Sequence, residues 1–325
     1  MKAPHSRCMV VIGSALALSL LVVPAWVAAQ TTFGRIAVFG TSLSDPGNAF
    51  AFTRAASTPP YADLDQFLVP DNPYAKGGHH FSNGATWVEQ FARPSGLAGI
   101  TRPAFQGSSS GAANYAVGGA RAREDGININ LSYQVNTFLR AANGAVPSGS
   151  LCVIEMGSND VRDAFVAFAS GGDGSAILQQ ALTSIGNNIG TLYAAGARRF
   201  LVWNVPDIGL TPALRALDQI SPGAAALGSF VTVVFNSNLE MLLGSLAVLP
   251  GIEIVKLDVF QLVREITSDP AAFGLTIVDR ACVSPNSPPF ECNVPDEYLF
   301  WDGIHPTKAV HAIVAQNAAT TLAQR

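Results

Sequence analysis

Three side chains near the two ends of the sequence are of the types that nucleophilic acyl chemistry requires. Ser42 lies in the segment FGTSLSDPGN, and Asp302 and His305 lie in FWDGIHPT. A serine hydroxyl becomes an effective nucleophile when an imidazole accepts its proton, and a carboxylate can fix the tautomer of that imidazole. We therefore expect Ser42 as nucleophile, His305 as base and Asp302 as the orienting acid. The first segment alone is not specific, because Ser, Asp, Pro and Gly also form turns for conformational reasons.

Donors for a developing oxyanion occur in three separate segments. The tetrahedral intermediate of acyl transfer carries a negative oxygen that needs preorganised N–H groups. The backbone N–H of Ser42, a backbone N–H of the NYAVGGA segment and the side-chain amide of Asn159 in GSND can supply them. In NYAVGGA the pair Gly118 and Gly119 offers two registers, and we favour Gly119.

Five short apolar runs predict the strands that would carry these residues at their ends. They are residues 35–40, 113–119, 151–157, 198–204 and 251–258. Runs of this length ending at Gly, Asn or Asp are typical of buried parallel strands. Ala/Leu-rich stretches predict helices at 176–197, 228–249 and 305–324, with Pro306 in the first turn of the last. The second stretch contains VTVVF, which favours strand locally. The alternation predicts an α/β fold with helices on both faces of a parallel sheet and a site at its carboxyl edge.

The segments FGTSLSDPGN, NYAVGGA, GSND and DGIHP, in this order, resemble the marker blocks of the GDSL, or SGNH, hydrolase family. The resemblance spans residues 39–306. It implies a flavodoxin-like three-layer sandwich with a central, mostly parallel five-stranded sheet. It also implies hydrolysis of esters or lipids by a Ser-His-Asp mechanism, an oxyanion hole from Ser, Gly and Asn, and no cofactor.

Thr41 departs from the family pattern, which has aspartate at this position. The position has no role in the family's triad, so we expect Thr41→Asp to be nearly silent in rate. Asp45 and Asn48 complete the block, and we expect them to hold the turn by bonding backbone N–H groups.

Composition and charge narrow the class of protein. Hydrophobic residues make up 49% of the 325 residues and charged residues only 13%, which is enough apolar surface for one large core. A net charge of -4 with no run of Lys or Arg argues against a nucleic-acid partner.

The N-terminal segment predicts export. Lys2 and Arg7 precede an apolar run that ends in the small-residue pattern of residues 27–29, as in a secretory signal peptide. An uncleaved membrane anchor is the rival interpretation. We expect residues 1–29 to be a signal peptide, which places the protein outside the cytoplasm, secreted or periplasmic. Residues 30–325 should form a single domain with a long, Pro-rich insertion at about residues 49–112.

Three cysteines remain after the signal peptide. Cys282 and Cys292 flank a Pro-rich loop, where a disulfide would cross-link a segment with little regular structure, so we expect them to pair. Cys152 lies in an apolar strand run and should be a buried free thiol. The spacing lacks the CxxC and HxxxH patterns of a four-ligand zinc site, and we expect no metal.

Several alternatives stay open on the sequence. Gly107–Gly111 matches the G-x-S-x-G nucleophile elbow, but Ser109 lacks the strand before it that the motif requires. The adjacent His79 and His80 should face solvent or substrate. The same triad would serve an acyltransferase, and the fold would also serve a non-catalytic exported binding module. As substrate we expect a small-molecule or lipid ester, lipid ahead of acetylated sugars, and a lipid would entail transient contact with a membrane or lipid surface. The oligomeric state is not set by the sequence.

Overall fold

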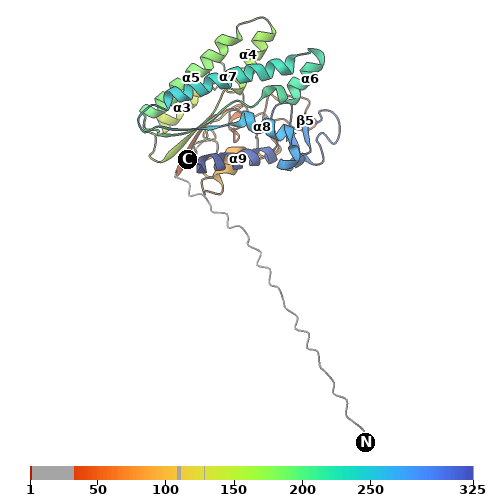
Figure 1. Cartoon of the computed structure of the whole chain (residues 1–325), viewed down its shortest axis with the longest axis horizontal. Coiled ribbons are helices and arrows are strands. Elements are labelled where there is room, and N and C mark those ends of the chain that lie inside the picture. Colours follow the sequence, from red (N-terminus) through yellow and green to blue (C-terminus); the bar gives the residue numbers. More distant parts are fainter. Residues whose placement is uncertain (2–32, 108–110, 128, 325) are drawn as a thin grey trace. The chain divides into compact units, whose positions relative to one another are not determined.

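Four parallel strands form the central sheet of the computed structural model, which describes residue 1 and residues 33–107, 111–127 and 129–324. The strands are β1 (Arg35–Gly40), β2 (Ser150–Glu155), β3 (Arg199–Trp203) and β4 (Glu253–Leu257), in the spatial order β1-β2-β3-β4 (Figure 1). The residues of the predicted signal peptide after Met1, and Ser109 of the elbow motif, lie outside the described residues.

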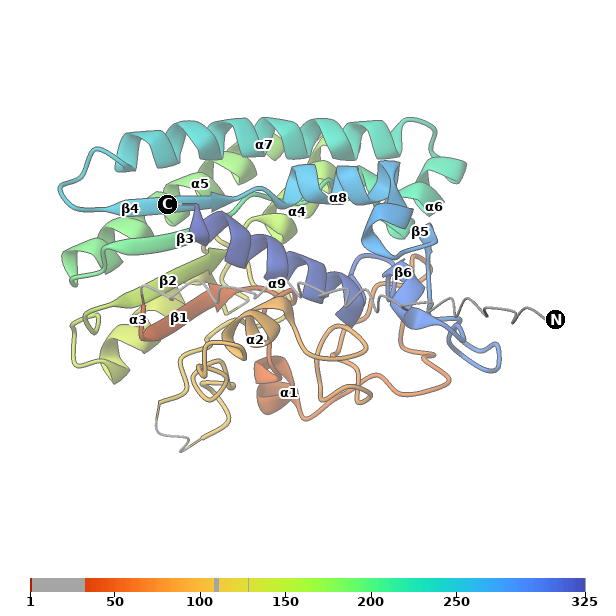
Figure 2. The same cartoon turned by 60° about the horizontal axis from the view of Figure 1, so that its bottom comes forward.

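Helices cover both faces of this sheet. One face packs against α3 (Leu131–Ala141), α4 (Ser158–Ala169), α5 (Gly174–Ala194) and α7 (Ala224–Leu246), and the other against α2 (Trp87–Ala92), α8 (Val259–Ser268) and α9 (Lys308–Ala323). The alternation along β1 explains the two cores, since Ala37 and Phe39 belong to the first and Ile36 and Val38 to the second. Helices α2 and α9 lie side by side on their face (Figure 2). The predicted α/β class with three layers is confirmed.

The predicted five-stranded sheet is wrong in its strand count. Residues 113–117 run beside β1, and the backbone N–H groups of Tyr115 and Val117 donate to the carbonyls of Val38 and Gly40. Against β1 only Val38 and Asn114 form a bridge, and Asn114 forms a second isolated bridge with Pro103, so the segment is not a strand. The pairing with β1 goes no further because the Gly40 backbone N–H, which would extend it, donates to the Gln134 side-chain oxygen at 2.9 Å.

One helix prediction is confirmed and another needs correction at its start. The VTVVF segment is helical inside α7, as predicted for residues 228–249, because packing on α4, α5 and α6 outweighs its local strand preference. By length and composition α7 is the one described helix that could cross a membrane, yet these contacts are those of a covering helix in an α/β domain. Helix α9 begins at Lys308 with Thr307 as its N-cap, so Pro306 precedes the cap instead of entering the first turn.

The remaining short elements surround the carboxyl edge of the sheet. They are α1 (Asn48–Thr53), the 3₁₀ turn η1 (Ile208–Leu210), α6 (Pro212–Ile220), η2 (Pro270–Phe273), β5 (Ile277–Ala281), η3 (Pro295–Glu297) and β6 (Tyr298–Phe300). Strands β5 and β6 pair in parallel as a separate two-stranded sheet. The chain leaves β6 directly into the DGIHP segment.

Candidate active site

Ser42 lies in a turn just beyond β1 that the carboxylate of Asp45 organises. Asp45 is fully buried, and its two oxygens accept the backbone N–H groups of residues 47–49 at 2.5–3.0 Å and that of Gly118 at 2.8 Å. Burial raises the pKa of Asp45 to about 6, and the four N–H donors oppose this rise. These contacts occupy Asp45 in the turn. It is therefore not the acid that meets His305.

Ser42, His305 and Asp302 form a continuous chain of hydrogen bonds. Nε2 of His305 lies 2.9 Å from Oγ of Ser42, and Nδ1 of His305 lies 2.8 Å from Oδ2 of Asp302. The second oxygen of Asp302 accepts the backbone N–H groups of Ile304 at 2.9 Å and His305 at 2.7 Å. Asp302 and His305 are both buried. In this arrangement the imidazole can take the Ser42 proton on one side while the carboxylate holds its other nitrogen.

Tyr74, from the segment between β1 and α2, completes the hydrogen bonding of Asp302. Its hydroxyl donates to Oδ2 of Asp302 at 2.9 Å, the same oxygen that meets His305. Burial and the neighbouring carboxylate raise the pKa of Tyr74 far above its usual range, so the phenol stays protonated and acts as a donor. Its ring packs edge-on against Trp301 and Tyr61. Nothing in the spacing of the sequence indicates this contact.

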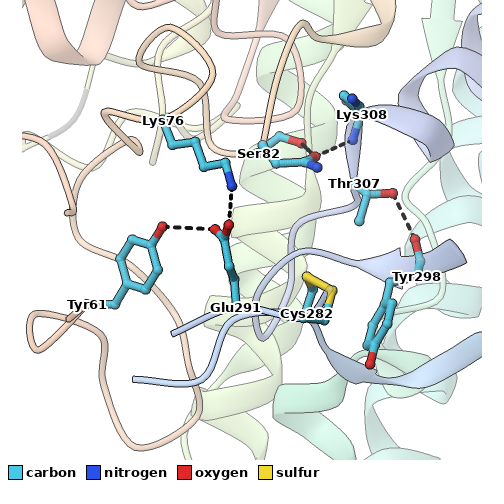
Figure 3. Close-up of a disulfide and its surroundings, with 10 residues drawn as sticks. Tyr61, Lys76, Ser82, Cys282, Glu291, Tyr298, Thr307 and Lys308 are labelled. Atoms are coloured by element: carbon cyan, nitrogen blue, oxygen red, sulfur yellow. Dashed lines mark hydrogen bonds and ion pairs between the residues drawn. A yellow bond between two sulfur atoms is a disulfide. The ribbon is translucent and has the colours of Figure 1, made fainter. Parts of the chain in front are cut away.

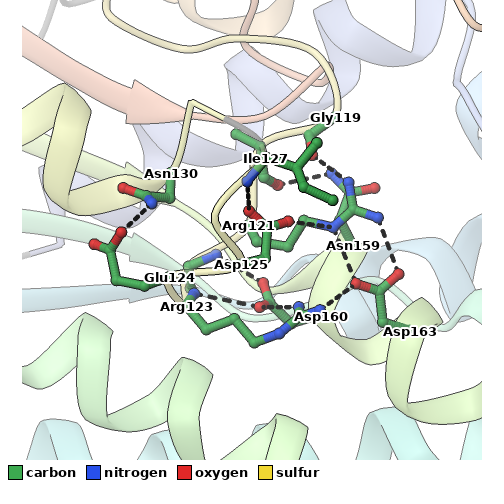
Figure 4. Close-up of polar contacts among 12 residues, drawn as sticks. Gly119, Arg121, Arg123, Glu124, Asp125, Ile127, Asn130, Asn159, Asp160 and Asp163 are labelled. Atoms are coloured by element: carbon green, nitrogen blue, oxygen red, sulfur yellow. Dashed lines mark hydrogen bonds and ion pairs between the residues drawn. The ribbon is translucent and has the colours of Figure 1, made fainter. Parts of the chain in front are cut away.

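The predicted oxyanion donors lie near one another, and their hydrogen bonds separate the two glycine registers. The Gly118 N–H is taken by Asp45, whereas no described residue accepts the N–H of Gly119 or that of Ser42. Gly119 has a φ of +79°, a conformation that favours glycine. One N–H of the Asn159 amide donates to the Ala120 carbonyl at 2.9 Å, which leaves the other available. Figure 4 shows Gly119 and Asn159 close together.

Glu155 is a buried carboxyl beside the serine turn that the sequence analysis did not single out. It ends β2 in register with Gly40 of β1. Its carboxyl accepts the Thr41 backbone N–H at 2.9 Å and the Thr41 hydroxyl at 2.9 and 3.1 Å. Burial raises the pKa of Glu155 to about 7. A charged residue within the apolar run LCVIEMG was the available signal.

Thr41 therefore has a structural partner that the sequence analysis did not anticipate. The residue is buried, and an aspartate there would face the Glu155 carboxyl at hydrogen-bond distance. Two carboxylates at that distance cannot both ionise without a large cost. The expectation that Thr41→Asp is nearly silent in rate stays a prediction, and the contact with Glu155 adds an expected loss of stability for this variant.

A small cavity of about 60 Å³ opens beside Ser42. Ser42, His305 and Asn159 line it together with the apolar side chains of Ile208, Leu214 and Ile304. A cavity that binds benzene measures about 150 Å³, so this space holds only the part of a substrate near the reacting carbonyl. A second cavity of about 310 Å³, between Leu210 and Ser229, contains none of the predicted catalytic residues.

The disulfide region lies against the segment that carries Tyr74. Cys282 and Cys292 are joined by a disulfide in the structure, and Cys152 is a buried free cysteine whose thiol pKa is raised to about 12 by burial. Within the disulfide loop, Glu291 forms an ion pair with Lys76 and accepts from the Tyr61 hydroxyl at 3.5 Å (Figure 3). The loop thus contacts Tyr61 and Lys76 in the segment that also carries Tyr74.

His80 and His311 have partners outside this site. His80 is buried, contrary to the expectation of a solvent-facing or substrate-facing residue, and its Nε2 lies 2.9 Å from Oε2 of Glu89. Burial lowers the pKa of His80, but the Glu89 carboxylate outweighs this and raises it above the ordinary value. His311 accepts the backbone N–H of Trp87 at 3.2 Å, and burial lowers its pKa to about 3. The residues that the structure describes include no group of three or more His, Cys, Asp or Glu side chains that could hold a metal ion.

Comparison with known proteins gives a consistent assignment. The sequence model described as GDSL-like Lipase/Acylhydrolase matches residues 36–318. A GDSL esterase/lipase of Arabidopsis thaliana is 32% identical over 314 residues, covering 87% of this chain and 85% of the relative. A phosphatidylcholine-sterol acyltransferase of Aeromonas hydrophila is 26% identical and covers 90% of both chains. A Bacillus subtilis protein of known crystal structure aligns with a TM-score of 0.40 and 14% identity over 89% of this chain and 56% of its own. The family resemblance seen in the sequence is confirmed, and this chain belongs to the GDSL-like lipase/acylhydrolase family.

Proposed function

We propose that the protein is an exported serine ester hydrolase of the esterase/lipase type. The observation that carries this proposal is the unbroken chain from Ser42 Oγ through His305 to Asp302, at 2.9 and 2.8 Å. A buried Ser-His-Asp chain beside a cavity is the geometry that general-base activation of a serine requires. A fold alone would not require these three side chains to meet, which argues against a non-catalytic binding module.

The reaction proceeds in two acyl-transfer steps. Ser42 Oγ attacks the ester carbonyl carbon while Nε2 of His305 accepts its proton, and Asp302 stabilises the imidazolium. The negative oxygen of the tetrahedral intermediate is held by the N–H groups of Ser42 and Gly119 and by the free N–H of Asn159. His305 then returns the proton to the departing alcohol. Water, deprotonated by His305, attacks the acyl-serine and releases the carboxylic acid.

Gly119 is the glycine donor in this proposal. Gly118 already donates its N–H to Asp45, and a side chain there would place Cβ 2.1 Å from the ring of Phe81. Gly118 therefore stabilises the turn through Asp45 and leaves room for Phe81, and Gly119 donates its N–H to the oxyanion.

Lipid esters remain the favoured substrates, ahead of acetylated sugars. The family name and the apolar wall of the cavity support an acyl ester, and no nucleic-acid partner fits the chain's negative charge. We retain residues 1–29 as a signal peptide and residues 30–325 as a single domain. Acyl transfer to an alcohol is the second candidate function, because one relative is named as a phosphatidylcholine-sterol acyltransferase. Product analysis with and without a sterol or a simple alcohol separates transfer from hydrolysis.

The test of the proposal compares two serines on a chromogenic ester such as 4-nitrophenyl butyrate. Ser42→Ala should lower kcat by about 10⁴-fold or more, because the nucleophile is lost. Ser109→Ala, which removes the rival elbow nucleophile, should keep most of the activity. A circular dichroism spectrum of each variant checks the fold. An active Ser42→Ala protein together with an inactive Ser109→Ala protein would transfer the assignment to the elbow, and a wild-type chain inactive on every ester would refute the hydrolase.

A further inference from the structure

Arg162 faces the same cavity as the proposed oxyanion donor Asn159. The two residues are three positions apart on α4, so their side chains share one face of the helix. Ser42, Asn159 and Arg162 all line the cavity. A guanidinium group therefore lies within reach of a substrate bound at Ser42, on the α4 side of the site.

The Arg162 side chain forms no hydrogen bond or ion pair with a described residue, and its only attractive charges there are the more distant carboxylates of Asp163 and Asp65. It forms none of the hydrogen bonds or ion pairs that the structure contains there, although Asp163 follows it directly in the chain. Both oxygens of Asp163 are already used, since Arg121 donates to them at 3.0 Å each and Arg123 donates to one at 2.8 Å. Asp160 is bonded in the same way, to Arg123 at 3.0 Å and to the Ala122 N–H at 2.8 Å (Figure 4).

The position of each side chain on α4 explains why the two acids are paired and Arg162 is not. Asp160 and Asp163, also three positions apart, lie on the face of α4 that meets Arg121 and Arg123, whereas Asn159 and Arg162 lie on the cavity face. Arg121 and Arg123 pair with Asp160, with Asp163 and, at 3.8 Å, with Asp125. Arg162 takes part in none of these ion pairs.

An unpaired, partly buried cation carries a desolvation cost that an anion can offset. Burial and the repulsion of Arg121 lower the pKa of the Arg162 guanidinium, so its environment disfavours the bare charge. A guanidinium presents five N–H donors in a planar fork that matches the two oxygens of a phosphate or a carboxylate. An oxyanion bound there would bring a hydrogen-bonded counter-charge to a guanidinium that has no hydrogen-bonded acid among the described residues.

We propose that Arg162 forms a subsite for an oxyanion of the ester substrate, a phosphate diester or a carboxylate held close to the scissile carbonyl. The inference rests on the proposed function, because it places the subsite relative to a carbonyl bound at Ser42. It adds a substrate class: esters that carry a negative group within a few bonds of the ester linkage, such as a glycerophospholipid. Arg162 binds and orients this group and takes no part in proton transfer.

The experiment measures kcat/KM on two matched pairs of esters. Dihexanoylphosphatidylcholine and dihexanoylglycerol, both below their critical micelle concentrations, share the acyl esters and differ in the phosphocholine group, which contains the phosphate diester. Mono-4-nitrophenyl adipate and 4-nitrophenyl hexanoate share the leaving group and chain length and differ in a carboxylate. For Arg162→Gln the ratio of charged to neutral substrate should fall about 10- to 100-fold in one of the two pairs, as for a lost hydrogen bond to a charged group. The pair that responds tells whether phosphate or carboxylate is the ligand.

Control variants make the result specific. Arg140→Gln removes the same charge from the exposed end of α3 and should leave both ratios at the wild-type value. Arg162→Lys keeps the charge but loses the fork, and its ratio should lie between those of wild type and Arg162→Gln. Ratios that stay at the wild-type value in Arg162→Gln overturn the subsite. An equal loss of kcat/KM on the charged and the neutral ester of each pair also leaves the ratio unchanged. It would overturn the subsite and place Arg162 at the oxyanion of the tetrahedral intermediate.

A binding measurement separates failure of the subsite from failure of the proposed function. Calorimetric titration of the Ser42→Ala variant with dihexanoylphosphatidylcholine and with monoethyl adipate measures binding without turnover. Adding Arg162→Gln should weaken the binding of one of the two anions about 10-fold or more. A wild-type chain inactive on all four esters refutes the hydrolase, and the titration then still decides the subsite. If each anion binds Ser42→Ala and the double variant with Arg162→Gln with the same affinity, the subsite is refuted and the proposed hydrolase is not.

Discussion

Glu155 links the pH dependence of stability to the turn that carries Ser42. Its carboxyl is fully buried at the end of β2 and is bonded to the backbone and hydroxyl of Thr41. Glu155→Gln keeps the size of the side chain. The amide oxygen can still accept the Thr41 N–H, and the amide nitrogen can donate to the Thr41 hydroxyl. The substitution therefore removes the titration of this group while it keeps the contacts of the turn.

The magnitude follows from the pKa of Glu155, which burial raises from 4.5 to about 7. A folded-state pKa above the unfolded one means that the folded protein holds the proton more tightly. The contribution to stability is then fully present below pH 4.5 and is lost as the pH rises through 7. At about 1.4 kcal/mol for each pH unit between the two values, the wild-type protein loses about 3 kcal/mol of its unfolding free energy over this range. Glu155→Gln has no such loss.

The assay is urea unfolding at 25 °C, followed by tryptophan fluorescence, at pH values from 4.5 to 8.5. The unfolding free energy of Glu155→Gln minus that of wild type should increase by about 2–3 kcal/mol across the series. Other buried carboxyls such as Asp45 titrate in both proteins and cancel in this difference. Glu240→Gln, which changes a mostly exposed carboxylate on α7, should show a nearly constant difference. A constant difference for Glu155→Gln as well would show that Glu155 titrates alike in the folded and unfolded chains, and the argument from burial would fail.

Two further predictions concern the contacts beside the triad. Tyr74→Phe removes one hydrogen bond to the Asp302 carboxylate, so we expect a loss of about 1–3 kcal/mol in stability and a lower kcat with little change in KM, because the phenol lies outside the cavity. Tyr61→Phe, the same change in the adjacent ring, should leave kcat at the wild-type value in the same ester assay. Thr41→Asp should lower the unfolding free energy by about 2–5 kcal/mol at pH 8 and by less at pH 5, because it faces the Glu155 carboxyl. The double variant with Glu155→Gln should recover most of this loss, and a double variant no more stable than Thr41→Asp would exclude the carboxyl contact.

The sequence predicted four of the five proposed strands correctly, and the fifth segment failed to form one. Residues 35–40, 151–157 and 198–204 are largely buried apolar runs, residues 251–258 form the partly exposed edge, and all four correspond to strands. Residues 113–119 have the same pattern and run beside β1, but the Gln134 side chain accepts the Gly40 N–H that would extend their pairing. An apolar run in the sequence does not show which groups form hydrogen bonds with its backbone N–H and C=O groups.

Some residues of the candidate site could be predicted from the sequence and others could not. Ser42, Asp302 and His305 could be predicted as neighbours because nucleophilic catalysis restricts the residue types, and the structure joins the three by hydrogen bonds. Tyr74 could not be found, because its contact depends on how the long segment before α2 packs. Arg162 could not be found either, since an arginine next to Asp163 suggests an ion pair until the neighbouring carboxylates are seen to be taken.

The separation of Ser42 and His305 has a consequence for biosynthesis. The chain must be extended by 263 residues beyond Ser42 before His305 exists, although the two side chains end 2.9 Å apart. Chains are made from the N-terminus, and β1 through β4 with most of the covering helices precede His305. Throughout that interval the serine lacks the imidazole that would accept its proton, and an unassisted serine hydroxyl is a weak nucleophile. The order of residues along the chain thus delays the completion of the site until nearly all of the fold has been synthesised, and any fragment that ends before residue 305 keeps the serine in this unactivated form.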